Sequence, residues 1–90
     1  MFRRRWFSGE IVSGEGFSIL PKRDQIIYRE KGRTLRMTAD MGTRGFTVFL
    51  DSIARWDDAP QSAISPPESI RIAGNVRRAL ESQGREVDLQ

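Results

Sequence analysis

Strict alternation of apolar and polar side chains over residues 33–39 constrains the fold of this 90-residue chain more than any other feature. In an extended strand Leu35, Met37 and Ala39 would face one side, and the polar residues between them would face the other. Residues 24–30 are rich in β-branched and aromatic side chains, and Gly32 separates the two runs. Glycine readily adopts the positive φ of a tight turn, so the pattern predicts a β-hairpin with one solvated face.

Further strands are predicted on both sides of this hairpin. Residues 41–45 contain two glycines and predict a turn, after which residues 46–50 alternate in a third strand. Upstream, residues 10–12 and 17–20 flank a Ser-Gly-Glu-Gly turn and predict another hairpin, which ends at Pro21. Hairpins that follow one another in this way form an antiparallel meander.

A helix-start signal lies at Ser65. This serine can cap free backbone amides, Pro66 suits the first helical position, and Glu68 suits the positive end of a helix. With a 3.6-residue period one apolar stripe follows, formed by Ile72, Ala73, Val76, Ala79 and Leu80. The opposite, exposed side is expected to carry Arg71, Asn75, Arg78 and Ser82. Gly84 is expected to cap the helix, and residues 85–89 alternate again.

These elements predict an α+β fold in which one long C-terminal helix packs on one face of an antiparallel sheet of four to six strands. We expect a single domain over residues 1–90, with a basic, flexible start at 1–8, the sheet within 9–60, the helix over 65–83 and a short terminal strand at 85–89. The expected core consists of Ile26, Tyr28, Leu35, Met37, Phe46, Val48, Leu50, Ile72, Val76 and Leu80.

The chain contains no cysteine and no histidine. Thiolate nucleophiles, imidazole bases and the commonest zinc ligands are therefore excluded, and no other nucleophile is paired with a base in the sequence. We expect no enzymatic activity, no metal and no cofactor. Ser8, Gly9 and Glu10 follow the basic start where a signal peptide needs an apolar run. No window approaches the roughly 18 apolar residues of a membrane span, so a soluble cytoplasmic protein is expected.

The connection over residues 51–60 carries the most distinctive side chains, namely Asp51, Arg55, Trp56, Asp57 and Asp58. The favoured interpretation of Trp56 is that its ring closes one end of the core. The other interpretation is that it anchors an interface, with the acids as a polar rim. The acids are either solvated caps of local turns or a surface for a cationic partner. Their spacing lacks the glycine-containing pattern of calcium loops, which disfavours a metal site.

The formal net charge of +3 is unevenly distributed. Up to Arg36 there are nine Lys or Arg against four Asp or Glu, and after it there are six against eight. Arg29, Arg33 and Arg36, together with the amino-terminal arginines and Trp6, form an alternative basic face that would suit single-stranded nucleic acid through charge and stacking. A solvated strand face explains the same arginines.

The chain resembles the immunity protein 74 family over about residues 24–88. The resemblance is carried by Ile-Tyr-Arg-Glu-Lys-Gly-Arg-Thr-Leu-Arg at residues 27–36, Gly-Phe-Thr-Val-Phe at 45–49, Ser-Ile-Ala-Arg-Trp at 52–56 and Arg-Ile-Ala-Gly-Asn-Val at 71–76. Its most specific part is the Ser-Ile-x-x-Trp stretch ahead of a proline. The family tends to have prolines soon after this tryptophan, whereas three residues precede Pro60 here.

The resemblance implies a small α+β protein that binds and neutralises a cognate toxin of a bacterial polymorphic or contact-dependent inhibition system. It implies that the protein occludes the active or functional surface of the toxin in the producing cell, with specificity in loop contacts. No toxin-contact residue is carried over from the family, so the toxin-binding hypothesis for residues 51–58 rests on their own chemistry. An acidic loop would suit a basic nuclease toxin, because an enzyme that attracts phosphates also attracts carboxylates.

Overall fold

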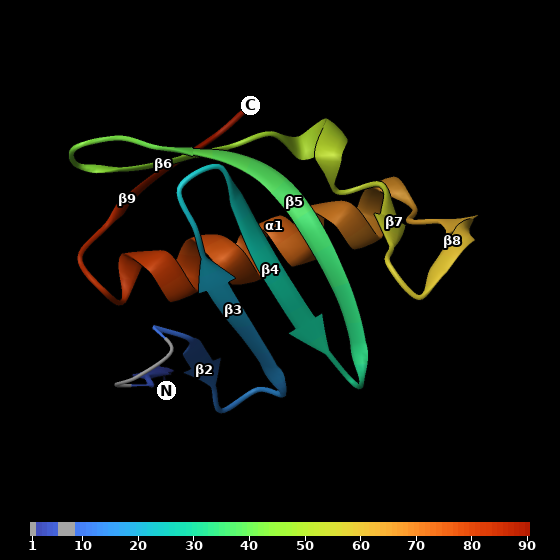
Figure 1. Ribbon diagram of the computed structural model, residues 1–90, viewed down its shortest axis with the longest axis horizontal. Helices are drawn as coiled ribbons and strands as arrows, with labels where there is room; N and C mark the ends of the chain where they lie inside the picture. Colours follow the sequence, from blue (N-terminus) through green and yellow to red (C-terminus); the bar gives the residue numbers. More distant parts are fainter. Residues whose placement is uncertain (1, 6–8) are drawn as a thin grey trace.

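A computed structural model describes residues 2–5 and 9–90 and shows one curled sheet packed against one helix (Figure 1). Across the sheet the strands follow the order β1, β2, β3, β4, β5, β6 and β9. Their bounds are Phe2–Arg4 for β1, Ile11–Ser13 for β2, Phe17–Pro21 for β3, Gln25–Glu30 for β4, Arg33–Met41 for β5, Gly45–Val48 for β6 and Glu86–Leu89 for β9. The predicted α+β class is confirmed.

The β4–β5 hairpin forms as the alternation predicts. Leu35 pairs with Tyr28 and Met37 pairs with Ile26, and all four side chains are buried. The turn residues Lys31 and Gly32 have φ values of 51° and 76°, the positive values that a two-residue hairpin turn requires. The hairpin of β2 and β3 is also confirmed.

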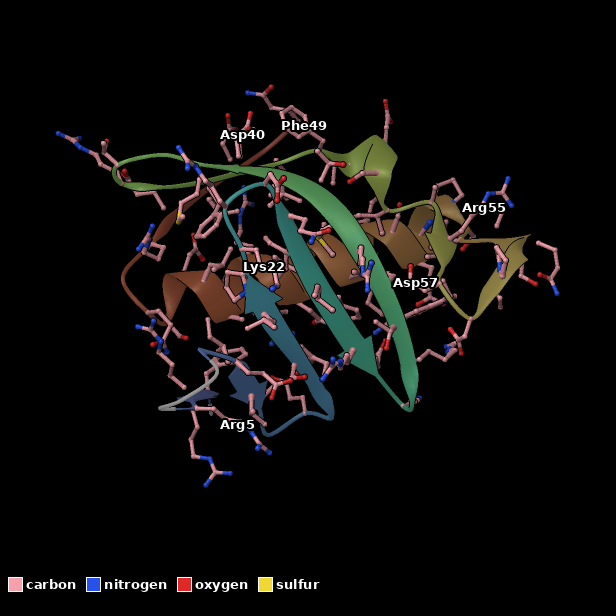
Figure 2. The ribbon with its side chains drawn as sticks, viewed as in Figure 1. Arg5, Lys22, Asp40, Phe49, Arg55 and Asp57 are labelled. Carbon is pink, nitrogen blue, oxygen red and sulfur yellow. The ribbon has the colours of Figure 1, made fainter. Side chains whose placement is uncertain are left out.

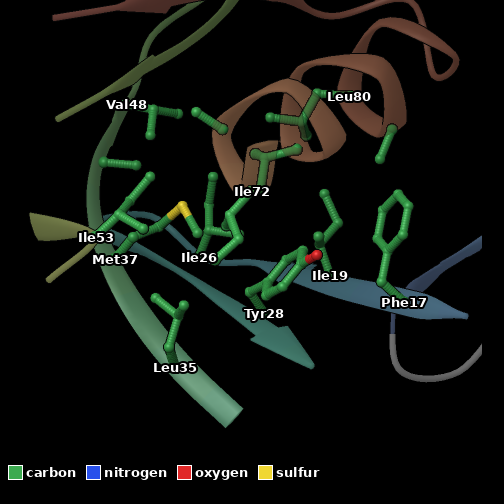
Figure 3. Close-up of a cluster of buried hydrophobic side chains, with 14 of the residues drawn as sticks. Phe17, Ile19, Ile26, Tyr28, Leu35, Met37, Val48, Ile53, Ile72 and Leu80 are labelled. Carbon is green, nitrogen blue, oxygen red and sulfur yellow. The ribbon is translucent and has the colours of Figure 1, made fainter. Parts of the chain in front are cut away.

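Helix α1 (Pro66–Glu81) covers the inner face of the sheet, and the side chain of Ser65 accepts a hydrogen bond from the amide of Glu68 at 3.4 Å. Figure 3 shows Ile72 and Leu80 of the helix pointing toward Ile19 and Ile26 of the sheet. Every expected core residue is buried except Leu50, which is partly buried. The core also contains residues that were not in the expected set: Ile11, Phe17, Ile19, Ala39, Ile53, Trp56, Ala73 and Ala79.

The prediction of four to six antiparallel strands is wrong in two respects, because the sheet has seven strands and its last pair, β6 and β9, is parallel. Parallel neighbours need a crossover, and here α1 provides it between the two strands. Gly45 permits the pairing, since a Cβ at this position would lie only 1.9 Å from the carbonyl oxygen of Glu86.

Part of the amino-terminal segment, which the sequence predicted to be basic and flexible, forms an edge strand. Residues 2–4 form β1, which pairs antiparallel with β2, and the ring of Phe2 packs edge-on against Phe17 with 5.9 Å between centroids. An aromatic contact therefore holds part of the basic start on the sheet. Residues 1 and 6–8 lie outside the described part of the chain.

Between β6 and α1 the chain leaves the main sheet, at the connection that the sequence predicted over residues 51–60. It forms a 3₁₀ turn, η1 (Leu50–Ser52), and then a separate two-stranded sheet of β7 (Arg55–Trp56) and β8 (Ala59–Ala63). Figure 1 shows β8 extending beyond the end of the main sheet.

Among the described residues no helix is long and apolar enough to cross a membrane.

Candidate functional site

The 50–63 segment, which comprises η1, β7 and β8, projects from the sheet but is held to it by hydrogen bonds. The hydroxyl of Ser52 accepts from the Thr38 amide at 2.8 Å and donates to the Phe49 carbonyl at 2.6 Å. The Asp57 amide donates to the Thr34 carbonyl of β5 at 2.7 Å. These contacts fix both η1 and β7 against β5.

Trp56 anchors the segment from inside. Its side chain is only 4% exposed, and its ring centroid lies 6.2 Å from that of Tyr28 in the core. The guanidinium of Arg33 stacks over the outer side of the ring at 4.4 Å. A ring covered in this way does not present an interface edge, so Trp56 occupies the place that its core interpretation predicts and positions the exposed residues around it.

The three aspartates of the segment are all exposed but differ in their surroundings. Asp57 lies beside β5 (Figure 2), where its carboxylate is 3.6 Å from Nε of Arg36. Asp51 and Asp58 make no hydrogen bond or ion pair through their carboxylates with any described residue. Two negative charges are thus available to a partner, while the third is partly compensated.

Arg55 stabilises the hairpin of β7 and β8, whose turn contains Asp57 and Asp58. One of its guanidinium nitrogens donates to the Pro60 carbonyl at 2.7 Å, across the turn between β7 and β8. Figure 2 shows Arg55 at the outer end of the molecule, away from Asp57 on the sheet side. The predicted site residues therefore share one segment without forming one compact cluster.

The alternative basic face is not a continuous stripe. Arg29 and Arg36 lie on the outer face of the sheet, but Arg33 belongs by alternation to the inner side, with Leu35, and covers Trp56. Each of the outer two arginines has an acidic neighbour: Arg29 lies 3.8 Å from Glu10, and Arg36 lies next to Asp57. Trp6, which the hypothesis also included, is outside the described residues.

Sequence reasoning missed a row of polar contacts between α1 and the sheet. Arg71 donates two hydrogen bonds of 2.8 Å to the buried carboxylate of Glu30. Asn75 donates to the Tyr28 hydroxyl at 2.9 Å, and Arg78 forms an ion pair with Glu15 at 2.9 Å. The helix prediction placed all three of these side chains on the exposed face, but Asn75 is buried.

The environment of these contacts changes the pKa values of Glu30, Arg71 and Tyr28. Hydrogen bonds from Arg71 lower the pKa of Glu30 below its ordinary value, although burial opposes them. The same contacts raise the pKa of Arg71. Burial raises the pKa of Tyr28 above its ordinary value, which keeps its hydroxyl protonated. One signal in the sequence was available, because a tyrosine assigned to a core needs a partner for its hydroxyl.

Among the described residues there is no group of three acidic, histidine or cysteine side chains that could hold a metal ion. No protein-family model, curated protein or solved structure matches the chain. The resemblance to the immunity protein 74 family therefore stays a prediction.

Proposed function

We propose that the protein is a non-enzymatic immunity protein that binds a cognate bacterial toxin in the cytoplasm of the producing cell. It would occlude the active or functional surface of that toxin with the 50–63 segment. The observation that carries this proposal is the pair of exposed carboxylates of Asp51 and Asp58, which have no partner among the described residues and stand on a segment that the core holds in place.

The contacts that hold the 50–63 segment in one conformation favour binding. A loop already held in one conformation loses less entropy on association than a mobile loop, so more of the contact energy appears as affinity. Burial of Trp56 and the hydrogen bonds of Ser52 provide this support without using the exposed side chains of β8. The segment is therefore suited to carry specificity.

The charges suggest the kind of partner. Carboxylates at a binding surface accelerate association with a positively charged protein and disfavour partners with acidic surfaces. A nuclease toxin carries such a positive surface, because its active site must attract phosphates. A basic nuclease domain is accordingly the partner that we propose.

The alternative, a nucleic-acid-binding sheet that uses Arg29, Arg33 and Arg36, has less support. Two of these arginines lie near carboxylates and the third is stacked on Trp56. A surface for phosphates needs cations that are free to replace counterions.

The test is binding to the toxin encoded by the neighbouring upstream gene. Asp51→Lys with Asp58→Lys should slow association at least about tenfold at low salt and weaken protection of producing cells, because it replaces attraction with repulsion. Asp40→Lys with Glu81→Lys changes the net charge equally at exposed positions outside the segment and serves as the matched control.

Equal association rates for both double variants would refute the role of the segment. If neither variant nor the unchanged protein binds the toxin, while single-stranded DNA binds and Arg36→Gln abolishes that binding, the nucleic-acid alternative would replace the proposal.

A further inference from the structure

A pocket of about 310 Å³ is lined in part by Leu80, Gln83 and Arg85, at and just beyond the carboxyl end of α1. Figure 1 shows this end of the helix at the opposite end of the molecule from β8. Several elements far apart in the sequence contribute to the pocket. Its lining comprises Arg4 from β1, Ile11 from β2, Pro21 from β3, Met41 from β5, Phe46 from β6, Leu80 from α1, and Gly9, Gln83 and Arg85 from connections. The volume lies at the lower end of the roughly 300–1,000 Å³ that is typical of small-molecule sites.

Arg85 is the residue of this pocket whose bonding is incomplete. Its guanidinium lies over the ring of Phe46 at 5.2 Å, and its Nε atom is buried without a hydrogen-bond partner. Buried donors are nearly always satisfied, because an unpaired one loses its hydration without compensation. The Nε atom itself is closed off from solvent, so the part of Arg85 that can meet a ligand is the outer part of its guanidinium, which makes no hydrogen bond or ion pair with a described residue.

The charges of the pocket have one sign. Neither Arg4 nor Arg85 forms an ion pair with a described residue, and no carboxylate of the described chain lines the pocket. The two guanidinium groups that line the pocket therefore offer charge-assisted hydrogen bonds to an anion.

Several of the other side chains that line the pocket are apolar. Ile11, Phe46 and Leu80 belong to the core, and Met41 is 45% exposed, one of two large apolar side chains among the described residues with such exposure. A ligand that covers Met41 would remove apolar surface from water. The pocket thus combines two cationic side chains with apolar surface that is partly exposed.

We propose that this pocket binds a small amphipathic carboxylate. The carboxylate would accept hydrogen bonds from the terminal guanidinium nitrogens of Arg85 and from Arg4, and the apolar body of the ligand would lie on Met41 and Phe46. The inference is independent of the proposed toxin binding, since none of the lining residues belongs to the 50–63 segment.

The probe is 3-phenylpropionate, titrated into the full chain labelled with ¹⁵N and followed by amide chemical shifts. Saturable shifts are expected at residues 41–46 and 83–86, which surround the pocket. The neutral analogue 3-phenylpropan-1-ol should bind at least about tenfold more weakly, because it lacks the charge-assisted hydrogen bonds, and inorganic phosphate should be weaker as well for lack of an apolar body.

Arg85→Gln should weaken binding of 3-phenylpropionate about tenfold or more. Arg77→Gln removes the same charge from an exposed helix position outside the pocket and should bind like the unchanged protein. Arg4→Gln provides a second test if Arg85→Gln does not fold, because Arg4 is exposed on an edge strand. The proposal is overturned if the probe does not saturate, if the alcohol binds equally well, or if Arg4→Gln and Arg85→Gln both retain full affinity.

Discussion

Among the described residues Glu30 is the only charged side chain that is buried. Its two oxygens each accept a hydrogen bond from Arg71, which in turn also contacts Glu68. A buried charge is tolerated when it is paired and costs stability when its partner is lost. The contact therefore ties the position of α1 to the end of β4 through one pair of side chains.

Glu30→Gln should lower the free energy of unfolding at pH 7 by about 1–3 kcal/mol, because a neutral amide loses the charge-assisted hydrogen bonds. The folded-state pKa of Glu30 is lowered, so its contribution is fully present above the ordinary carboxyl pKa of 4.5. It is lost as the pH falls through the lowered value.

The difference in unfolding free energy between the unchanged protein and Glu30→Gln should therefore become smaller in acid. Urea denaturation at pH 7 and pH 3 measures this difference. Glu81→Gln, an exposed helix position, should leave the unfolding free energy nearly unchanged at both pH values. A difference for Glu30→Gln that stays constant down to pH 3 would show that its charge does not contribute as described.

At the scale of elements, the parallel pair of β6 and β9 depends on the close approach of two backbones. The register places Gly45 opposite Glu86, and the side chains of Val87 and Leu89 then pack against the core. Beyond the pair, the Leu50 amide donates to the Gln90 carbonyl at 2.7 Å, which links β9 to η1. The start of the projecting segment is thus stabilised by the last strand.

Gly45→Ala should displace β9, since the added Cβ would overlap the backbone of Glu86, and should destabilise the fold by about 1–3 kcal/mol. Gly74→Ala is the matched control: apart from the adjacent backbone of its own helix, no atom lies within 4 Å of its added Cβ, so it should stabilise α1 by about 0.5–1 kcal/mol. Thermal unfolding measures both changes. Hydrogen exchange of the Gln90 amide, which donates to Val48 at 2.9 Å, reports on β9 directly. Equal melting temperatures for the two variants would contradict this account.

The elements that the sequence predicts well are those with local signals. Alternation and a glycine turn specify β4 and β5, and the Ser65 cap with an apolar stripe specifies α1. The partner of β9 was not predictable in this way, because a four-residue strand carries no information about which distant strand it joins. Strands β7 and β8 were missed because β7 has two residues and β8 lacks apolar alternation.

The candidate site shows the same limit. Its chain segment was identified from composition, but the stacking of Arg33 on Trp56 and the approach of Arg36 to Asp57 join strand and loop residues about 20 positions apart. Such contacts follow from how β7 docks on β5. Asn75 was placed on the wrong side for a similar reason, since only the packed structure brings the Tyr28 hydroxyl to the flank of the helix.

At the scale of the whole molecule, one hydrophobic core lies between α1 and the sheet. Val76 of α1 is fully buried in it, whereas Ile70 on the same helix is 67% exposed. Because the molecule has a single core, a disruptive substitution on the buried face of α1 weakens the packing of every strand that contacts the helix.

Val76→Asp should cost about 4 kcal/mol or more, because it buries a charge without a partner, and should unfold much of the population. Ile70→Asp introduces the same group on the exposed side and should change the unfolding free energy by less than about 0.5 kcal/mol. Circular dichroism and tryptophan fluorescence should report one joint transition for helix and sheet. Separate transitions, or equal stability of the two variants, would contradict a single cooperative core.

The side chains of the 50–63 segment fall into a buried group and an exposed group, and this separation determines which of them can change without loss of the fold. Trp56 and Ile53 face the core, whereas Asp51, Asp58 and most of β8 face solvent. Substitutions at the outward positions should leave the free energy of unfolding almost unchanged. If the segment binds a toxin as we propose, partner preference can therefore change at these outward positions while the interior stays the same.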